Sequence, residues 1–550
     1  MNANKLTVVM AQLNPLVGDI RGNTALVIKT VRQAVSEFNA DMVVFSELML
    51  TAYPPEDLLL RPSLDLRIEK ALSAIMAEQF PVYVVLGHPG SEGERLYNML
   101  SVIRSGEVLA SYRKQCLPNY QVFDEKRYFS SGNEPCVLDI SGLKVAFSIC
   151  EDLWESGPML QAAAAGAGLM VNINGSPFHK NKLHERQAIL RQRAGEGNMP
   201  IIYVNQAGGQ DELVFDGGSM AVDESGRVRV LAPQFETQLT PVVLEMEGDA
   251  VARIEPGSIS PALPLTASVY QALVLGVRDY INKNGFRGVV LGLSGGIDSA
   301  LSLAVAVDAL GSERVHAVMM PFRYTSRMSI EDAETEARNL QVAYRVIPIE
   351  PIYDSFMRGL ADEFEGTSPD LTEQNIQARC RGVILMAISN KKGLLVLTTG
   401  NKSEMAVGYS TLYGDMAGGF DVLKDVSKMM VYELARFRNE QYAGQATAVI
   451  PQRVIDRPPS AELAPGQVDE DNLPPYPVLD KILELYIEQD YSANAIIESG
   501  FDHATVHKVL RLVDQNEYKR RQAPIGVRIS KRGFGRDRRY PVTSGWELGE

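Results

Sequence analysis

The chain contains 550 residues and carries a formal net charge of −14, from 54 lysines and arginines against 68 aspartates and glutamates. Because domains usually hold about 100 to 200 residues, this length predicts two large domains. The acidic balance excludes a chain that coats nucleic acid, and no apolar run reaches the ~20 residues that span a bilayer, so we expect a cytoplasmic chain without nucleic-acid or membrane partners.

In the first half of the chain, short apolar runs alternate with helix-like stretches. Each run is rich in Val, Ile and Leu and has the length of a buried strand. This alternation predicts an α/β fold. The predicted strands are residues 6–11, 42–46, 82–87, 144–150, 169–173 and 201–205.

Three reactive side chains lie at or near the ends of apolar runs. Glu47 follows Val43-Val-Phe-Ser, Lys114 precedes Leu117-Pro118, and Cys150 ends the run 144–150. Taken singly, the charged residues are also consistent with a buried ion pair, and the cysteine with a core residue. Together, their order and flanking residues resemble the nitrilase superfamily over residues 5–245. That resemblance implies an αββα sandwich.

The chemistry of this trio favours hydrolysis of an amide. The four cysteines show neither a disulfide framework nor zinc spacing, so Cys150 is expected to be a reduced thiol. A thiol needs a base, for which Glu47 is the candidate, and Lys114 can stabilise the oxyanion that follows attack on a carbonyl. A Cys-His dyad with His179 remains an alternative.

The resemblance also implies a binding site for glutamine in this half. In the nitrilase-like glutaminases, groups at the strand end after the nucleophile help to hold the substrate. Carried over to this sequence, the contacts with the substrate amide are Tyr120, Ser176 and Lys182. The alternative is that these three are ordinary polar loop residues.

The alternating pattern is interrupted near residues 245–265. Glu247-Gly248-Asp249 and three prolines follow one another there, which predicts a linker. We place the domain boundary near residue 260, giving a nitrilase-like domain of residues 1–260 and a second domain of residues 261–550.

The second half returns to alternating strands and helices, which predicts a doubly wound, Rossmann-like parallel sheet. Ser329 with Asp332 predicts a capping pair at the start of a helix. The proline-rich, acidic stretch 452–477 predicts a mobile surface loop near the nucleotide. Between 508 and 539 the chain is basic, which suits either a polyanionic ligand or a solvated or subunit-facing surface. The predicted strands are 288–293, 315–320, 344–349 and 394–399, and the helices include 300–310 and 372–389.

The run Ser294-Gly-Gly-Ile-Asp298-Ser299 lies between a predicted strand and a predicted helix. Its glycines let backbone N–H groups approach an anion, the serines add donors, and the helix presents its N-terminus to the same anion. Asp298 is placed to hold a magnesium ion that bridges phosphate oxygens. A tight strand-to-helix turn is the alternative interpretation. The run resembles the pyrophosphate-binding loop of the ATP-pyrophosphatase superfamily, whose adenine nucleotide alpha hydrolase-like fold is expected here.

Further motifs in the second half narrow the resemblance. They are Thr372-Glu-Gln-Asn-Ile-Gln-Ala-Arg379, Thr398-Thr-Gly-Asn-Lys-Ser-Glu404, Tyr413-Gly-Asp415, Pro459-Ser-Ala-Glu-Leu463 and Tyr518-Lys-Arg520. With the nitrilase-like half, they resemble the glutamine-dependent NAD(+) synthetase family. The segment 412–420 is longer than in ammonia-using relatives, which leaves the alignment of Asp415 and Asp421 open.

The resemblance implies three sets of ligand contacts in the second domain. Some single positions could equally be helix-surface residues. ATP is assigned to Gly292, Leu293, Ser294, Gly295, Gly296, Ile297, Asp298, Ser299, Thr399, Lys428 and Ser460. Deamido-NAD is assigned to Asn375, Arg379, Glu404, Asp421 and Lys519, and Mg²⁺ to Asp298 and Glu404.

The implied reaction is the ATP-dependent amidation of deamido-NAD to NAD. ATP and the nicotinate carboxylate form an acyl-adenylate with loss of pyrophosphate, and ammonia from glutamine displaces AMP. The scheme predicts a closed passage for ammonia from Cys150 to the Ser294 loop, and the family implies a homo-oligomer. Rival interpretations are another glutamine-fed ATP-pyrophosphatase, a non-catalytic nucleotide sensor, and an amidase that works without ATP.

Overall fold

A computed structural model describes residues 5–247, 251–441, 448–460, 462–464, 469–471 and 473–546 of the chain. The chain divides into two compact units. The first comprises Met1–Gln210 and Val214–Leu263, and the second comprises Asp211–Leu213 and Pro264–Glu550.

Two sheets form the centre of the first unit. The seven-stranded sheet has the order β15-β14-β1-β2-β3-β4-β5, and the six-stranded sheet has the order β13-β12-β9-β8-β7-β6. The first contains β15 (Val251–Ile254), β14 (Gln238–Glu247), β1 (Lys5–Gln12), β2 (Met42–Val44), β3 (Tyr83–Glu92), β4 (Arg95–Arg104) and β5 (Glu107–Arg113). The second contains β13 (Val228–Leu231), β12 (Met220–Val222), β9 (Ile201–Asn205), β8 (Leu169–Asn174), β7 (Leu143–Ile149) and β6 (Cys136–Ile140).

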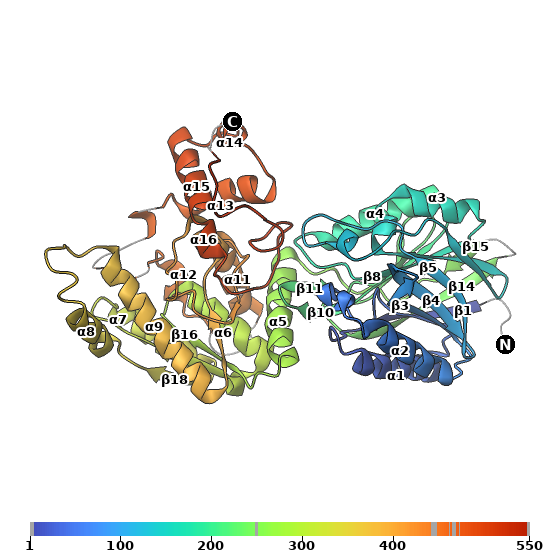
Figure 1. The fold of residues 1–550 in the computed structure, drawn as a ribbon, viewed down its shortest axis with the longest axis horizontal. Helices are drawn as coiled ribbons and strands as arrows, with labels where there is room; N and C mark the ends of the chain where they lie inside the picture. The colour runs from blue at the N-terminus through green and yellow to red at the C-terminus, as the bar shows by residue number, and fades with distance from the viewer. Residues whose placement is uncertain are drawn as a thin grey trace. The chain divides into compact units, whose positions relative to one another are not determined.

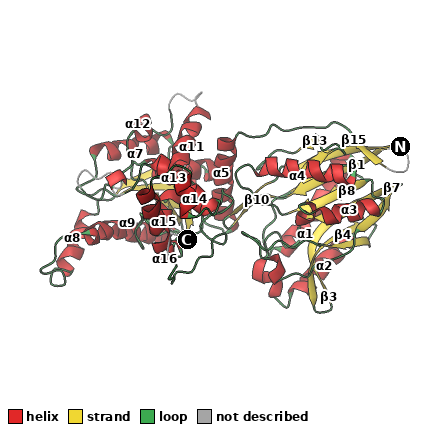
Figure 2. Ribbon diagram, turned by 90° about the horizontal axis from the view of Figure 1, so that it is seen from above, coloured by secondary structure: helices red, strands yellow, loops and turns green. Residues whose placement is uncertain are grey.

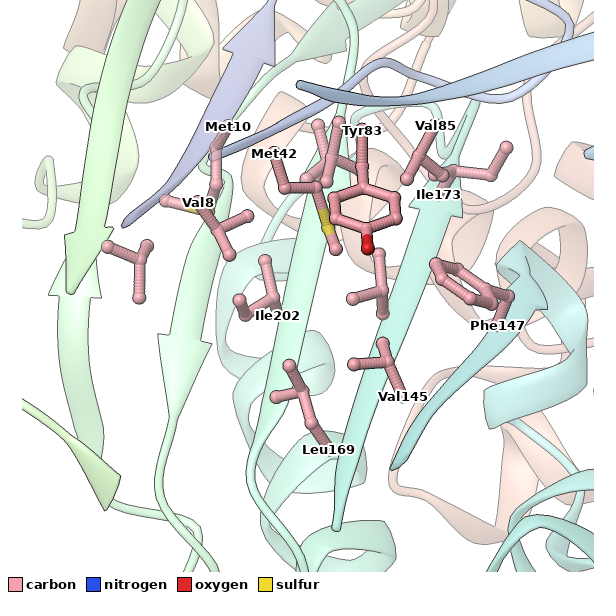
Figure 3. Close-up of a cluster of buried hydrophobic side chains, with 14 of the residues drawn as sticks. Val8, Met10, Met42, Tyr83, Val85, Val145, Phe147, Leu169, Ile173 and Ile202 are labelled. Carbon is pink, nitrogen blue, oxygen red and sulfur yellow. The ribbon is translucent and has the colours of Figure 1, made fainter. Parts of the chain in front are cut away.

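The two sheets pack face to face around one apolar core. Figure 3 shows Val8 and Met42 of one sheet near Ile202 of the other, and Met10 and Leu169 belong to the same buried cluster. On the outer faces lie α1 (Ile20–Phe38) and α2 (Leu64–Ala77) on one side, and α3 (Ser156–Ala164) and α4 (Lys182–Gly197) on the other (Figure 1). This arrangement is the predicted αββα sandwich.

Strand β7, which ends just before Cys150, is buried on both faces. Val145, Phe147 and Ile149 face the core between the sheets, whereas Ala146 joins the cluster under α3 and α4. Strands buried on both faces read as continuous apolar runs, as this one does. The polar side chains at the end of β7 are therefore held by a rigid strand.

The second unit contains a five-stranded, wholly parallel sheet. Its order is β18-β17-β16-β19-β20, so the chain moves outward in both directions from β16. This is the predicted doubly wound topology, and its switch point lies at the ends of β16 and β19. The strands are β16 (Val289–Gly292), β17 (Val315–Met319), β18 (Ala343–Val346), β19 (Leu395–Thr398) and β20 (Phe420–Asp421).

Helices enclose this sheet (Figure 2). Val290 and Val396 pack with residues of α8 and α9 on one face, while Val289 and Leu291, also buried, point to the other face, where α6 contacts β16 and β17. The helices around the sheet are α5 (Leu265–Lys283), α6 (Ile297–Leu310), α7 (Arg327–Asn339), α8 (Glu350–Gly359), α9 (Leu371–Lys392) and α11 (Lys428–Gln441).

A second apolar cluster joins the C-terminal helices to α10. Met405, Leu479, Ile496 and Val509 are among its buried members. Its helices are α10 (Lys402–Val407), α13 (Tyr476–Leu483), α14 (Ala493–Glu498) and α15 (His503–Gln515). Two short helices, α12 (Gln452–Asp456) and α16 (Glu517–Arg520), lie outside this cluster. None of the helices among the described residues combines the length and apolarity that crossing a membrane requires.

Several predicted elements require correction. Part of the predicted linker is a strand, because β15 pairs with β14 and Ala252 and Ile254 enter the core. Helix α7 begins at Arg327 and is capped by Ser326, whose hydroxyl accepts from the Ser329 N–H, so the predicted capping pair is wrong.

The stretch 452–477 is only partly a loop. It contains α12 and the start of α13, and the side chains of Val454, Ile455 and Tyr476 are buried. Its residues 461, 465–468 and 472 lie outside the described part. The basic tail is also less exposed than its composition suggests, since buried Arg528 pairs with Asp537.

Candidate active sites

The three reactive residues of the first unit lie just beyond strand ends. Glu47 follows β2, Lys114 follows β5, and Cys150 follows β7 as the first residue of a short 3-10 helix, Cys150–Leu153. Their exposed fractions are 0%, 1% and 5%. Strands of both sheets therefore place these three residues in one region that is buried from solvent.

Lys114 is held by two carboxylates. Its Nζ lies 2.7 Å from Glu47 Oε1 and 2.8 Å from Glu125 Oε1. Glu47 is also fixed by the Asn98 side-chain amide, at 2.7 Å, and by the Gly175 N–H, at 2.8 Å. Although burial disfavours its charge, the carboxylates of Glu125 and Glu47 raise the pKa of Lys114 well above its usual value. The two carboxylates therefore favour the charged form of Lys114.

Cys150 is a protonated thiol at rest. Burial and the Glu47 carboxylate raise its pKa well above the usual value, and Lys114 opposes this shift. Its backbone adopts φ of 45°, in the left-handed region that side chains rarely occupy. Such strain at the turn after a strand is typical of residues whose side chain must be presented to a ligand.

The predicted glutamine contacts surround the same strand end. The Tyr120 hydroxyl donates to Glu151 Oε1 at 2.7 Å, next to Cys150. Lys182 Nζ lies 4.1 Å from the centre of the Trp154 ring, and burial together with the charge of Arg186 lowers its pKa to about 8. Both Tyr120 and Lys182 act electrostatically on Cys150.

Ser176 is positioned by a fully buried ion pair. Arg186 Nη1 lies 2.8 Å from Asp216 Oδ1, and Arg186 Nη2 donates to the Ser176 carbonyl at 2.8 Å and to its Oγ at 3.2 Å. The side chain of Asn205 accepts from the Ser176 N–H at 2.9 Å. The Ser176 turn is therefore rigid.

Both ring nitrogens of His179 lie close to other groups. Its Nδ1 lies 2.8 Å from the Lys180 carbonyl, and its Nε2 lies 3.4 Å from Glu185. Burial lowers its pKa. These contacts favour Glu47 over His179 as the base for Cys150.

In the second unit, the phosphate loop joins β16 to α6. Gly295 has φ of 80°, and a Cβ atom there would lie 2.2 Å from the Ser329 carbonyl oxygen, so only glycine fits. The Ser294 and Ser299 hydroxyls are 3.0 Å apart, and Ser294 Oγ accepts from the Gly296 N–H at 3.2 Å. Within the part of the chain that the structure describes, no side chain caps the start of α6. Its first N–H groups therefore point to where an anion can bind.

Two carboxylates meet one cation beside this loop. Lys428 Nζ lies 2.6 Å from Asp298 Oδ2 and 3.0 Å from Glu404 Oε1. Asn401 donates to Asp298 Oδ1 at 2.8 Å and caps α10 by accepting from the Glu404 N–H. Burial raises the pKa of Glu404 to about 7, against the effect of Lys428.

This donor set can accept magnesium alongside phosphate. Among the described residues, no cluster of three or more His, Cys, Asp or Glu side chains could hold a metal ion alone. Mg²⁺ usually takes one or two carboxylates and completes its shell with phosphate oxygens and water. Asp298 and Glu404 fit this requirement.

Three predicted pyridine-nucleotide contacts converge on the segment 408–412. Asn375 Oδ1 accepts from the Thr411 hydroxyl at 3.0 Å, and Arg379 Nε donates to the Leu412 carbonyl at 3.3 Å. Lys519 Nζ donates to the Gly408 and Ser410 carbonyls at 2.7 and 2.9 Å. One turn apart on α9, Asn375 and Arg379 share a face, as their spacing predicts.

The remaining predicted contacts lie near the end of β19. Thr399 follows that strand and is half-buried, and Asp421 lies in the neighbouring β20. Asp421 is buried, which raises its pKa to about 7. Ser460 lies in the segment after α12, where its hydroxyl accepts from the Glu462 N–H at 3.2 Å.

Comparison with known proteins places both halves. The sequence matches the Carbon-nitrogen hydrolase family over residues 7–248 and the NAD synthase family over residues 269–523. A glutamine-dependent NAD(+) synthetase of Acinetobacter baylyi is 48% identical over 98% of each chain. This chain belongs to the glutamine-dependent NAD(+) synthetase family. The synthetase of Thermotoga maritima is 44% identical over 98% of this chain and 99% of its own.

A solved member of the family has the same fold. The structure of the Acinetobacter baumannii synthetase in complex with ADP is 45% identical in sequence, with a TM-score of 0.80 over 99% of this chain and 100% of the other. The synthetase of Cytophaga hutchinsonii, at 20% identity and a TM-score of 0.83, shares the fold. As members of this family do, the chain takes ATP as a co-substrate.

Two polar residues of the first site are not among those predicted from the sequence. Glu125 touches Lys114, and Asn98 touches Glu47. A signal for Glu125 was available, because it stands in a polar segment only eleven positions after Lys114. Asn98 lies within β4, and no local pattern distinguishes it from an ordinary strand residue.

Proposed function

We propose that this chain converts deamido-NAD to NAD, using ATP and the ammonia released from glutamine. The observation that carries the proposal is the full-length similarity to a synthetase at 48% identity, combined with a buried Cys-Glu-Lys site in one unit and a phosphate loop in the other. Glutamate, AMP and pyrophosphate are the by-products.

In the first site, Glu47 takes the proton of the Cys150 thiol, and the thiolate attacks the side-chain amide of glutamine. Lys114, held as a cation, stabilises the oxyanion. Ammonia leaves, and water then releases glutamate from the thioester. Tyr120 and Ser176 contact the substrate amide. For Lys182, which the sequence also assigns to the amide, we propose the α-carboxylate of glutamine instead, because an ammonium pairs best with a carboxylate.

In the second site, the N–H groups and serines of residues 292–299 bind the phosphates of ATP, while Thr399, Lys428 and Ser460 complete the nucleotide contacts. The nicotinate carboxylate displaces pyrophosphate, and ammonia then displaces AMP from the acyl-adenylate. Asn375, Arg379, Glu404, Asp421 and Lys519 bind deamido-NAD.

Magnesium is the metal that these residues suit. Asp298 and Glu404 would hold it, and when bound it neutralises phosphate charge during the displacement. Lys428, which contacts both carboxylates, keeps them together. We further propose that the protein works as a homo-oligomer, as the family resemblance implies.

The test supplies ATP, magnesium and deamido-NAD with either glutamine or ammonium chloride and follows NAD and pyrophosphate. We expect wild type to use both nitrogen sources and Cys150→Ala to retain only the ammonium-supported reaction. If neither source yields NAD, the proposed function is wrong. If glutamine-supported synthesis survives in Cys150→Ala, the assignment of the nucleophile is wrong.

A further inference from the structure

Arg457 connects the phosphate loop to two other segments. It follows α12, and its guanidinium donates from Nη2 to the Gly295 carbonyl and from Nη1 to the Ser329 hydroxyl at 3.0 Å. Gly295 itself lies against the carbonyl of Ser329. One side chain thus joins the loop, the first turn of α7 and the end of α12.

The bond to Gly295 fixes a peptide that the nucleotide site depends on. The Gly295 carbonyl belongs to the same peptide unit as the Gly296 N–H, which donates to Ser294 Oγ. Ser294 Oγ in turn contacts Ser299 Oγ. A guanidinium on the carbonyl therefore restricts the rotation of this peptide and polarises it toward an anion.

The charge of Arg457 is only weakly offset within the described residues. In the described ranges, Arg457 forms one ion pair, to Asp332 Oδ2 at 4.0 Å. Asp332 is itself bound more closely by Arg453, at 2.8 Å. Arg457 therefore contributes positive potential beside the phosphate loop, whereas Arg453 does not contact the loop.

Glu462, five positions after Arg457, contacts the same turn of α7. Glu462 accepts from the Ser329 hydroxyl at 2.7 Å and from the Ser326 N–H at 3.3 Å. Ser329 thus receives a bond from Arg457 and donates one to Glu462. Ser460, a proposed ATP contact, lies between these two anchors.

We propose that Arg457 is a positioning residue of the nucleotide site, which locks the phosphate loop in its anion-binding conformation and adds positive charge for the polyphosphate. The inference rests on the proposed function, because it assumes that the loop binds ATP. It assigns to Arg457 a role in the binding of polyphosphates, separate from recognition of the rest of the nucleotide.

The test measures the dissociation constants of full-length variants for Mg-ATP, for magnesium pyrophosphate and for adenosine by calorimetry. Arg457→Met removes the charge and the donors, Arg457→Lys keeps the charge without the planar fork, and Arg453→Met is the matched control. We expect Arg457→Met to weaken binding of ATP and pyrophosphate at least tenfold with adenosine unchanged, Arg457→Lys to recover part of the loss, and Arg453→Met to bind like wild type.

Three results would overturn the inference. The first is wild-type affinity for ATP and pyrophosphate in Arg457→Met. The second is an equal loss of affinity for these ligands in Arg453→Met, and the third is an equal loss of affinity for adenosine in Arg457→Met. Thermal unfolding of each variant without ligand tests its folding, and should Arg457→Met fail to fold, the comparison of Arg457→Lys with wild type decides. If wild type binds neither ATP nor pyrophosphate, the proposed function itself fails.

Discussion

Lys182 should make glutamine use sensitive to alkaline pH. Burial and the charge of Arg186 lower its pKa to about 8, so it is charged below pH 8 and neutral above. A neutral amine cannot pair with the α-carboxylate of glutamine. We expect the KM for glutamine to rise above pH 8, by up to about tenfold per pH unit. Lys182→Met should raise the KM at neutral pH and remove this dependence. Glutamate release is the measurement, and a KM that is flat across pH 7–9 in wild type would contradict the assignment.

Glu125 shares the catalytic cation with Glu47. Burial raises its pKa to about 7, with Lys114 opposing the shift. In Glu125→Gln the Lys114 ammonium keeps only one carboxylate partner, so we expect glutamine hydrolysis to fall on the order of 100-fold. Glu134→Gln, at an exposed position, is the control. Ammonium-supported synthesis should not change, and normal glutaminase activity would show that Glu125 serves only the fold.

Among single residues, the sequence predicts a functional side chain where that side chain belongs to a short motif. Glu47, Lys114 and Cys150 stand at strand ends, and the structure brings Glu47 and Lys114 into contact. Asn98 and Arg457 could not be found in this way. Their partners, Glu47 and Gly295, are 51 and 162 positions away in the chain, and no spacing rule connects residues that meet only after folding.

At the level of elements, the buried pair of Arg186 on α4 and Asp216 on β11 (Leu213–Asp216) should fix the turn that carries Ser176. Removing one partner leaves a buried charge unpaired, which costs about 3–5 kcal/mol. We expect Arg186→Met and Asp216→Asn each to lose stability on this scale, and Arg186→Met/Asp216→Leu to lose less than the sum of the two. Denaturant unfolding measures the loss, and strict additivity would show that the pair is not coupled.

The strands whose bounds the sequence predicts most closely are those buried on both faces, whereas the exposed edge strand β18 ends three residues before its predicted end. Parallel strands β7, β8, β9 and β16 appear as continuous apolar runs within a residue or two of their observed bounds. Antiparallel strands such as β5 and β15 were missed. Their residues alternate between core and solvent, and both strands lie close to glycine or proline, β5 after Gly106 and β15 between Gly248 and Pro256, so a short window resembles a loop. The Ser326 cap of α7 was missed because Ser329 and Asp332 offered a similar capping pattern one turn later.

At the scale of the whole molecule, the presence of both sites on one chain has a measurable consequence. Asp298→Asn should abolish NAD formation, because the phosphate loop loses a carboxylate that contacts Lys428, while glutamine hydrolysis at Cys150 continues. Cys150→Ala should lose glutamine hydrolysis but keep NAD formation from ammonium. An equimolar mixture of the two variants then contains both activities on separate chains.

That mixture distinguishes local use of ammonia from release into solution. Ammonia that escapes from one chain is diluted in solution, and at neutral pH most of it is protonated to unreactive ammonium. It therefore reaches the other chain at a low effective concentration. Each variant is supplied at the concentration used for wild type, so that the number of working sites of each kind is the same. With glutamine as the nitrogen source, we expect the mixture to form NAD more slowly than wild type, and added ammonium chloride to restore the rate. Equal rates with glutamine alone would mean that the two sites work independently and that their fusion gives no kinetic advantage. Because a homo-oligomer could exchange subunits and unite complementary sites, the mixture is assayed both at once and after prolonged incubation. A rate that rises only on incubation would show that intact pairs of sites form between subunits.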